Sequence, residues 1–373
     1  MMSTIRRTDL DAVRDLVHPS TATASVYLSL QPPEPTSDTS EDLHLRWRAL
    51  AGRLRADGAD EPTLAAVGEH VAGLRVSPTE IAIFAGDGEI RMARSLPGGP
   101  HYDLASFGTP PRVGPLLAWL RHRPPYVVVA IDRAGADLLT APRGALTGAE
   151  RTVLGPDDEI ERNAPGGWSQ PRYQRRAEDS WQHNAAAVAA AVAEELRRVG
   201  SDLVLVAGDV RASQLLRGRL ERVEHAIDVR RLPGGRGDDW SAPNRAAAIA
   251  QALDAYTAER TAATLARFAA VGGPAGRAVQ GVRPTLAALA AGQAEALLVA
   301  DDPADTRQAW FGDQVWAAAS PGDRKALEHA CRRGRMVDVA VRAALLTGAD
   351  VWMLERAEAS GLADGIGALR RYR

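Results

Sequence analysis

The chain has 373 residues, which a prior of about 150 residues per domain divides into roughly two to three domains. Hydrophobic residues make up 45% and charged residues 25%, so a peptide or a wholly disordered protein is excluded. The formal net charge is −2, and any positive surface able to bind nucleic acid must therefore be local.

Cysteine usage and the N-terminal sequence indicate a cytoplasmic protein. Cys331 is the single cysteine, which excludes an internal disulfide framework, a Cys-rich zinc site and an iron–sulfur cluster. The start MMSTIRRTDLDAVRDLV has acidic and polar residues where a signal peptide needs an apolar core. No apolar run reaches the roughly 18 residues that a membrane span needs. We expect neither a membrane nor DNA as a partner.

The N-terminal segment alternates helical and extended apolar patterns. Leu43, Trp47, Leu50 and Leu54 recur at helical spacing, whereas the run at 126–132 is continuously apolar, as in a buried strand. The predicted elements are a helix at 8–17, a strand at 22–30, a helix at 42–56, a hairpin at 81–96, a short helix at 116–120, and two strands at 126–132 and 136–141 that pair with each other.

Two further segments follow, and both alternate helices with strands. The middle segment predicts an exposed loop at 155–176, a helix at 177–199, a strand at 202–209, a helix at 211–222, a strand at 226–230 and a long helix from Ser241 to Gly272. The last segment predicts a helix at 276–291, a strand at 295–301, a helix at 322–333, a strand at 336–341, a short helix and a strand at 350–355. We therefore expect three α/β domains, at 1–141, 142–272 and 273–373, the last with a partly parallel sheet.

Several standard catalytic motifs are missing. The only lysine, Lys325, lies outside any Walker motif, and neither H-E-x-x-H nor G-x-S-x-G occurs. Asp202 and Asp209 flank a predicted strand, where a nuclease would place metal ligands, but solvated loop ends are the commoner explanation of such acids. We expect no metal and no cofactor.

The most informative segment runs from Arg162 to Arg176, and no acidic residue interrupts it. Its glycines permit close approach to a phosphate backbone, and its arginines supply forked donors. Trp168 and Tyr173 offer faces for stacking. A solvated loop whose arginines reflect codon bias is the alternative. The residues with candidate RNA contacts are Gly166, Gly167, Trp168, Ser169, Arg172, Arg175 and Arg176.

This segment resembles the middle domain of archaeal and eukaryotic class-1 peptide-chain release factors. The matching features are the glycine pair, Gln170, the arginine run, His183-Asn184 on the following helix and the strand DLVLVAGD. The tail GADVWMLERAEASGLADGIGALRRY resembles the last domain of bacterial relatives, the Vms1-like peptidyl-tRNA hydrolases and the Balon-type hibernation factors. The resemblance implies a ribonuclease-H-like middle domain and an L7Ae-like C-terminal domain.

The sequence departs from the release-factor pattern at the position that matters for catalysis. In release factors a glutamine directly follows the two glycines and helps to place the attacking water, whereas here Trp168 follows and Gln170 comes two residues later. Gln170 is therefore the one candidate catalytic residue. The decoding motifs are absent as well, so stop-codon recognition is not expected. His183 and Asn184 are interpreted as satisfying backbone groups rather than as catalysts.

Three hypotheses follow from the resemblance and the departures from it. The first is a ribosome-associated factor that binds the A site in a hibernation or stress role, with rRNA and tRNA as partners and a translational GTPase left open. The second is a peptidyl-tRNA hydrolase that rescues ribosomes through Gln170. The third is a stress scaffold that binds proteins only, which salt dependence of binding distinguishes from the other two.

Overall fold

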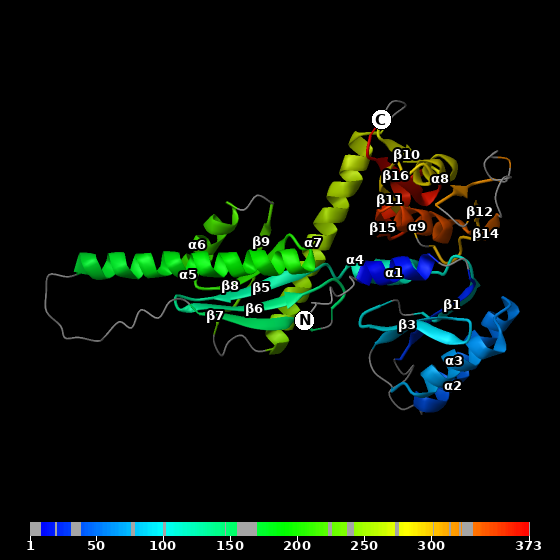
Figure 1. Ribbon diagram of the computed structural model, residues 1–373, viewed down its shortest axis with the longest axis horizontal. Helices are drawn as coiled ribbons and strands as arrows, with labels where there is room; N and C mark the ends of the chain where they lie inside the picture. The colour runs from blue at the N-terminus through cyan, green and yellow to red at the C-terminus, as the bar shows by residue number, and fades with distance from the viewer. Residues whose placement is uncertain are drawn as a thin grey trace, which may run out of the picture. The chain divides into compact units, whose positions relative to one another are not determined.

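The computed structural model describes residues 9–18, 21–30, 39–75, 79–99, 102–145, 147–154, 170–222, 226–236, 242–272, 276–300, 302–312, 315–320, 322 and 331–372. The fold is mixed α/β with several sheets, as predicted (Figure 1). The chain divides into two compact units, which are the first unit, residues 1–121 with 261–373, and the second unit, residues 122–260.

The N-terminal part of the first unit is built on an antiparallel sheet of order β3-β2-β1-β4. Its elements are α1 (Asp9–Val17), β1 (Thr23–Ser29), α2 (Thr39–Ala56), α3 (Glu61–Ala72), β2 (Glu80–Gly86), β3 (Glu89–Leu96), β4 (Leu104–Gly108) and α4 (Gly114–Arg121). The predicted hairpin is confirmed as β2 and β3, which are joined at Asp87 and Gly88, both with positive φ. The sequence patterns missed α3 and β4.

The C-terminal part of the first unit has a four-stranded sheet of order β10-β16-β11-β15 and a small sheet of order β13-β12-β14. Its elements are α7 (Ala242–Ala270, shared with the second unit), β10 (Ala278–Gln280), α8 (Val282–Ala290), β11 (Ala294–Ala300), β12 (Gln308–Phe311), β13 (Ala317–Ala318), β14 (Arg332–Arg335), α9 (Met336–Leu346), β15 (Asp350–Leu354) and β16 (Ile366–Arg370). The parallel pairing of β11 with β15 confirms the expected partly parallel sheet.

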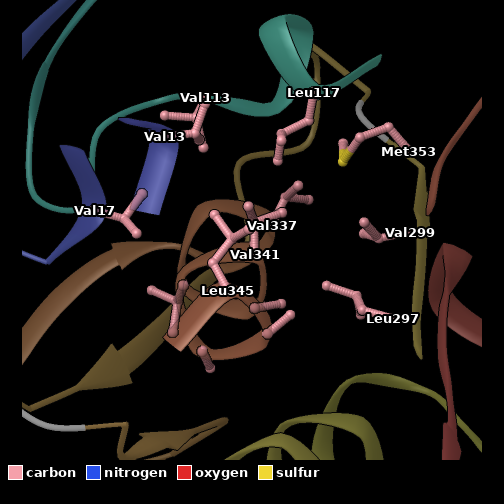
Figure 2. Close-up of a cluster of buried hydrophobic side chains, with 14 of the residues drawn as sticks. Val13, Val17, Val113, Leu117, Leu297, Val299, Val337, Val341, Leu345 and Met353 are labelled. Carbon is pink, nitrogen blue, oxygen red and sulfur yellow. The ribbon is translucent and has the colours of Figure 1, made fainter. Parts of the chain in front are cut away.

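Both faces of the N-terminal sheet are buried. Ala24, Val26 and Leu28 of β1 pack in the cluster with α2 and α3, whereas Tyr27, which points to the other face, belongs to a second cluster. That second cluster includes Val337 and Val341 of α9, so the N-terminal and C-terminal parts of the first unit share one core (Figure 2).

Three predictions in the C-terminal part are wrong. The first is the start of the helix expected at 276–291, because residues 278–280 form the strand β10. The run at 336–341 was expected to be a strand, but it opens α9, whose side chains are buried on nearly every side. Short apolar runs do not distinguish a buried strand from a buried helix, and the continuation RAALL supplies the length that a helix needs. Residues 332 and 333, expected to end the helix at 322–333, belong to β14, and residues 323–330 of that expected helix lie outside the described residues.

The second unit is built on a five-stranded sheet of order β7-β6-β5-β8-β9. Its elements are β5 (Tyr126–Ile131), β6 (Gly135–Ala141), β7 (Ala149–Leu154), α5 (Gln170–Val199), β8 (Leu203–Gly208), α6 (Val210–Leu220), β9 (Asp228–Arg231) and the first part of α7. An antiparallel run β5-β6-β7 is followed by β8 and β9, both parallel to β5, which agrees with the ribonuclease-H-like sheet that the resemblance implies.

The sheet of the second unit begins before residue 142. β5 and β6 pair with each other as predicted, but β5 also pairs with β8 and β6 with β7. Both strands therefore hydrogen-bond within the sheet of the middle segment, although we expected them in the N-terminal one. The division at residues 142 and 273 stays a prediction, beside a structure that has two units rather than three.

Candidate functional site

The predicted RNA-contact segment lies between β7 and α5 of the second unit. Gly166, Gly167, Trp168 and Ser169 lie outside the described residues. Gln170 is the first residue of α5, and Arg172, Arg175 and Arg176 belong to its first turns. For residues 170–180 the structure describes the backbone, and the description of side chains resumes at Trp181.

α5 begins seven positions earlier than the predicted start at residue 177, so part of the expected loop is helical. Pro171, which lies in the loop expected at 155–176, is the second residue of the helix, where the missing N–H costs nothing. The residues that follow, RYQRRAE, contain no helix breaker. Arg172, Arg175 and Arg176 are three and four positions apart, which places them on one face of the helix.

The later part of α5 packs on the sheet. Its buried residues, among those described, are Asn184, Ala185, Val188, Ala189, Ala191, Val192, Glu195 and Leu196. A helix of 30 residues is about 45 Å long, because each residue adds about 1.5 Å. Figure 1 shows that α5 continues well past the end of the sheet toward its N-terminus. The arginine-bearing turns are therefore an extension of a helix that is anchored farther along.

One contact that anchors α5 is made by Asn184. Its side chain is 6% exposed, and its Nδ2 donates a hydrogen bond of 2.7 Å to the carbonyl oxygen of Arg133, in the β5–β6 turn. This contact agrees with the predicted backbone-satisfying role, although Asn184 lies inside the helix and not at its start. His183, its neighbour, lies on the exposed side of α5.

A second contact fixes α5 beside α6. The guanidinium of Arg211 lies 5.1 Å from the centroid of the half-buried Trp181 ring, a cation–π geometry. Asp209 caps α6, because its carboxylate accepts hydrogen bonds from the backbone N–H groups of Arg211 at 2.8 Å and Ala212 at 2.9 Å. Asp209 is thus the N-cap of α6 in this structure.

Arg236 neutralises the acids at the carboxyl end of the parallel strands. It contacts Asp132 at 3.1 Å and Asp137 at 2.8 Å, and its hydrogen bond to Asp137 lowers the pKa of that carboxyl. Among the described residues, no group of three His, Cys, Asp or Glu is placed to hold a metal ion. The Arg236 guanidinium therefore balances the charge of both carboxylates.

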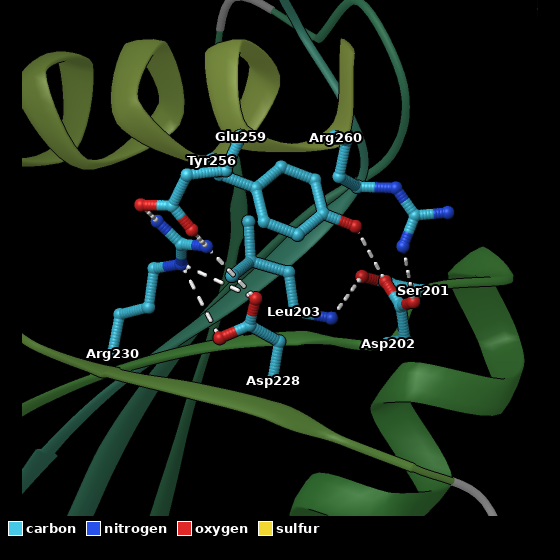
Figure 3. A network of polar contacts seen from close by, with 8 residues as sticks. All are labelled: Ser201, Asp202, Leu203, Asp228, Arg230, Tyr256, Glu259 and Arg260. Carbon is cyan, nitrogen blue, oxygen red and sulfur yellow. Dashed lines mark hydrogen bonds and ion pairs between the residues drawn. The ribbon is translucent and has the colours of Figure 1, made fainter. Parts of the chain in front are cut away.

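The opposite end of the strands carries a polar network that sequence patterns did not predict (Figure 3). Tyr256 of α7 donates a hydrogen bond of 2.7 Å to Asp202, and Arg260 pairs with the same carboxylate at 3.1 Å. Burial, followed by the contact with Asp202, raises the pKa of Tyr256. Arg230 joins Asp228 at 2.9 Å to Glu259 at 2.6 Å. The network fastens α7 to β8 and β9, so Asp202 has a structural role.

Two solved structures and a curated protein are similar to this chain. The chain is similar to the archaeal translation termination factor aRF1, with 13% identity over 98% of this chain and 99% of that one and a TM-score of 0.22. It is also similar to archaeal Pelota in a ribosome-bound model with ABCE1, with 15% identity over 98% and 94% and a TM-score of 0.39. A curated relative, the uncharacterized protein Rv2629 of Mycobacterium tuberculosis strain H37Rv, is 26% identical over 90% of both chains.

The part of the chain that resembles the archaeal and eukaryotic release factors matches a family model, in agreement with the resemblance at residues 166–184. Residues 125–274 match the Bacterial archaeo-eukaryotic release factor family 2. The matched region begins just before β5 and ends beyond α7, so it spans the whole sheet of the second unit together with the arginine segment. Among the described residues, no helix combines the length and the hydropathy that crossing a bilayer requires.

Proposed function

We propose that the protein is a ribosome-associated translation factor that enters the A site and contacts RNA phosphates through the segment 162–176. Its role is hibernation or stress protection, without stop-codon recognition. The observation that carries the proposal is the start of α5, where three arginines occupy the first turns of a 30-residue helix within the family match.

The charge at the start of α5 supports an anionic partner. The first turn of α5 contains no acidic residue, and the positive end of the helix dipole lies there as well. Arginine forms bidentate hydrogen bonds with phosphate, and each neutralised phosphate releases counterions. Dipole and side chains therefore favour the same partner, a polyanion.

The position of Gln170 supports a binding role over a hydrolytic one. A release-factor glutamine directly follows its glycines, whereas Gln170 is the first residue of α5 and is separated from Gly167 by two residues. Orienting a water molecule requires a donor held near the ester, and a change of about 1 Å can cost a hundredfold in rate. The displaced glutamine therefore favours occupancy of the site without peptide release.

The solved relatives suggest the partners. Pelota is described on the ribosome with ABCE1, and yeast Dom34 is described as interacting with Hbs1. We propose the ribosome as the partner of this chain as well. The experiment below is done with and without a translational GTPase, which tests whether that partner is needed. rRNA and the tRNA of the A-site region are the expected contacts.

Sedimentation through sucrose gradients tests the proposal. Purified protein mixed with ribosomes is expected in the ribosomal fractions at low salt, with and without added GTPase, and to leave them steeply as salt rises. Absence from these fractions at every salt concentration, in lysates of both growing and starved cells, contradicts the proposal. Ribosome binding that is insensitive to salt favours the protein-only scaffold.

The alternative function, peptidyl-tRNA hydrolysis, rests on Gln170 standing at the start of the helix beside the glycine pair. It predicts release of peptide from ribosomal peptidyl-tRNA and loss of that release in Gln170→Ala. Gln170→Glu, which keeps the size of the side chain, is the matched control. Equal rates of peptide release for the wild type and both variants would show that Gln170 takes no part in hydrolysis. If the wild type releases no peptide, hydrolysis is excluded and the binding role is the one that stands.

A further inference from the structure

The small sheet β13-β12-β14 of the first unit places one aromatic residue in the core and another on its outer face. β12 has the sequence QAWF, and Ala309 and Phe311 are 0% and 1% exposed within the core cluster. Side chains alternate along a strand, so Trp310 points to the opposite face, where it is half-buried. Figure 1 shows β12 and β14 beside the larger C-terminal sheet.

β14 brings an arginine over this outward tryptophan. Trp310 pairs with Arg333 in the antiparallel register, which puts both side chains on one face. The guanidinium carbon of Arg333 lies 5.4 Å from the centroid of the Trp310 ring. Arg333 is exposed, and among the described residues its guanidinium contacts this ring and no carboxylate.

The neighbouring arginines bind the protein instead. Arg307 pairs with Asp305 at 2.7 Å. Arg335 donates to the backbone oxygens of Asp302 at 2.6 Å and Asp305 at 3.2 Å. These guanidinium groups hold the segment in place, whereas that of the exposed Arg333 lies over the Trp310 indole.

A guanidinium stacked on an indole suits a particular kind of ligand. Its outer face is planar and can stack a nucleobase, and its forked N–H edge matches a phosphate. Unpaired bases commonly stack on aromatic rings and on arginine planes, whereas bases inside a duplex do not offer their faces. The Trp310 ring and the Arg333 guanidinium with its N–H donors lie on one sheet face. Together these groups can form such a site.

We propose that Trp310 and Arg333 form a stacking site for an unpaired base of single-stranded RNA, with Arg333 also contacting a phosphate. The site lies in the first unit, outside residues 125–274 and apart from the arginine segment of α5. It adds a second RNA contact to the chain, and it does not require that the protein act in the ribosomal A site.

The test measures binding of fluorescein-labelled octa-adenylate to the full chain by fluorescence anisotropy at low salt. The background is the triple variant Arg172→Ala, Arg175→Ala, Arg176→Ala, so that binding by the α5 segment is removed. Trp310→Ala is expected to weaken binding about tenfold, in line with the loss of one stacked base. Arg333→Lys keeps the charge but loses the planar group, and about a threefold loss is expected.

Two controls keep the outcome decisive. Arg48→Ala removes an exposed arginine elsewhere in the first unit and is expected to change affinity less than about twofold, because it costs only long-range charge. Thermal melting checks that Trp310→Ala still folds, and the exposed Arg333→Lys supplies the same test without touching the core. An RNA duplex of equal length is expected to bind without sensitivity to Trp310→Ala.

Several results would overturn the inference. These are no binding of octa-adenylate in the triple background, equal affinity for Trp310→Ala, Arg333→Lys and their background, or equal sensitivity of the duplex. Unchanged RNA affinity combined with lost sedimentation on ribosomes would assign the surface to a protein partner. Failure of the A-site proposal leaves this test intact, because the oligonucleotide assay contains no ribosome.

Discussion

The two ends of α5 differ in the charged residues that lie near them. At the carboxyl end, Arg198 pairs with Glu195 at 2.6 Å, and Arg151 of β7 reaches Glu194 at 2.8 Å and Glu195 at 3.3 Å. Burial alone would raise the pKa of Glu195, but the hydrogen bonds from its arginine partners lower it. Charge there is neutralised within the domain, where the helix packs on the sheet.

At the amino end of α5 the sequence supplies positive charge without acids. No Asp or Glu occurs between Arg162 and Arg176, and α5 continues there past the end of the sheet. One helix therefore combines a carboxyl end whose ion pairs stabilise the fold with an amino end where the sequence concentrates positive charge. We therefore expect substitutions at the carboxyl end of α5 to change stability, and substitutions at its amino end to change binding.

The largest effect is expected from the amino end. The triple variant Arg172→Ala, Arg175→Ala, Arg176→Ala should lower ribosome affinity about a hundredfold at low salt and reduce the salt slope by roughly two to three, because each lost phosphate contact removes about 0.9 from that slope. Co-sedimentation at several salt concentrations measures both quantities.

The matched control for the triple variant is the double variant Arg197→Ala, Arg198→Ala at the carboxyl end of the same helix. It removes positive charge from a region that already contains acids, and ribosome affinity should stay within about twofold of wild type. Equal losses in the two variants would show that net charge matters and the position along α5 does not.

The anchor comes next in expected size. Asn184→Ala leaves the Arg133 carbonyl without its buried donor and should lower the free energy of unfolding by about 1–3 kcal/mol. Denaturant unfolding of the full chain, followed by circular dichroism, measures the loss. Asn184→Asp, which cannot donate in its ionised form, should destabilise at least as much. An unchanged unfolding curve for both variants would show that the hydrogen bond from Asn184 to Arg133 does not stabilise the fold.

Tyr256→Phe is expected to cost less, about 1 kcal/mol, because Asp202 keeps its pairing with Arg260. The folded-state pKa of Tyr256 is raised, so the stability it contributes is present below the unfolded pKa of about 10 and is lost as the pH rises above that value. Wild type should therefore lose stability more steeply than Tyr256→Phe between about pH 9 and 11. If the free energy of unfolding falls equally with pH in the wild type and in Tyr256→Phe over that range, the raised pKa of Tyr256 is contradicted.

The smallest effect is expected for Arg151→Ala. Its ion pairs with Glu194 and Glu195 are half-exposed, and such pairs contribute about 0–1 kcal/mol. Thermal melting at low and high salt measures the change, and the difference from wild type should shrink as salt screens the pairs. A loss of stability larger than that caused by Asn184→Ala would show that the Arg151 ion pairs stabilise the fold more than the Asn184 hydrogen bond does.

Sequence patterns predicted the elements whose periodicity is long or whose turns are specific. α2, α7, the β2–β3 hairpin and the β5–β6 pair are confirmed, because helical stripes and tight-turn residues determine them locally. α9 was mistaken for a strand, since its burial on nearly every side erases periodicity. The pairing of β5 with β8 was missed because it joins residues 77 positions apart, such as Val127 and Val204, which no local pattern records.

The candidate site was predictable in composition and less so in conformation. The arginines and Gln170 were identified from sequence, but Pro171 concealed the start of α5, because proline is equally compatible with a loop and with a first helical turn. The Trp310–Arg333 stack could not be found at all from sequence. It depends on the strand register of residues 23 positions apart, one of them within a stretch that was expected to be helical.

One cryo-EM map of ribosomes mixed with the full chain tests the central claim most directly. The account predicts density in the A site, with the first turns of α5 and residues 162–176 beside rRNA phosphates near the peptidyl-transferase centre. Ribosomes with no bound protein, or a bound protein whose α5 start points into solvent or against another protein, would contradict it.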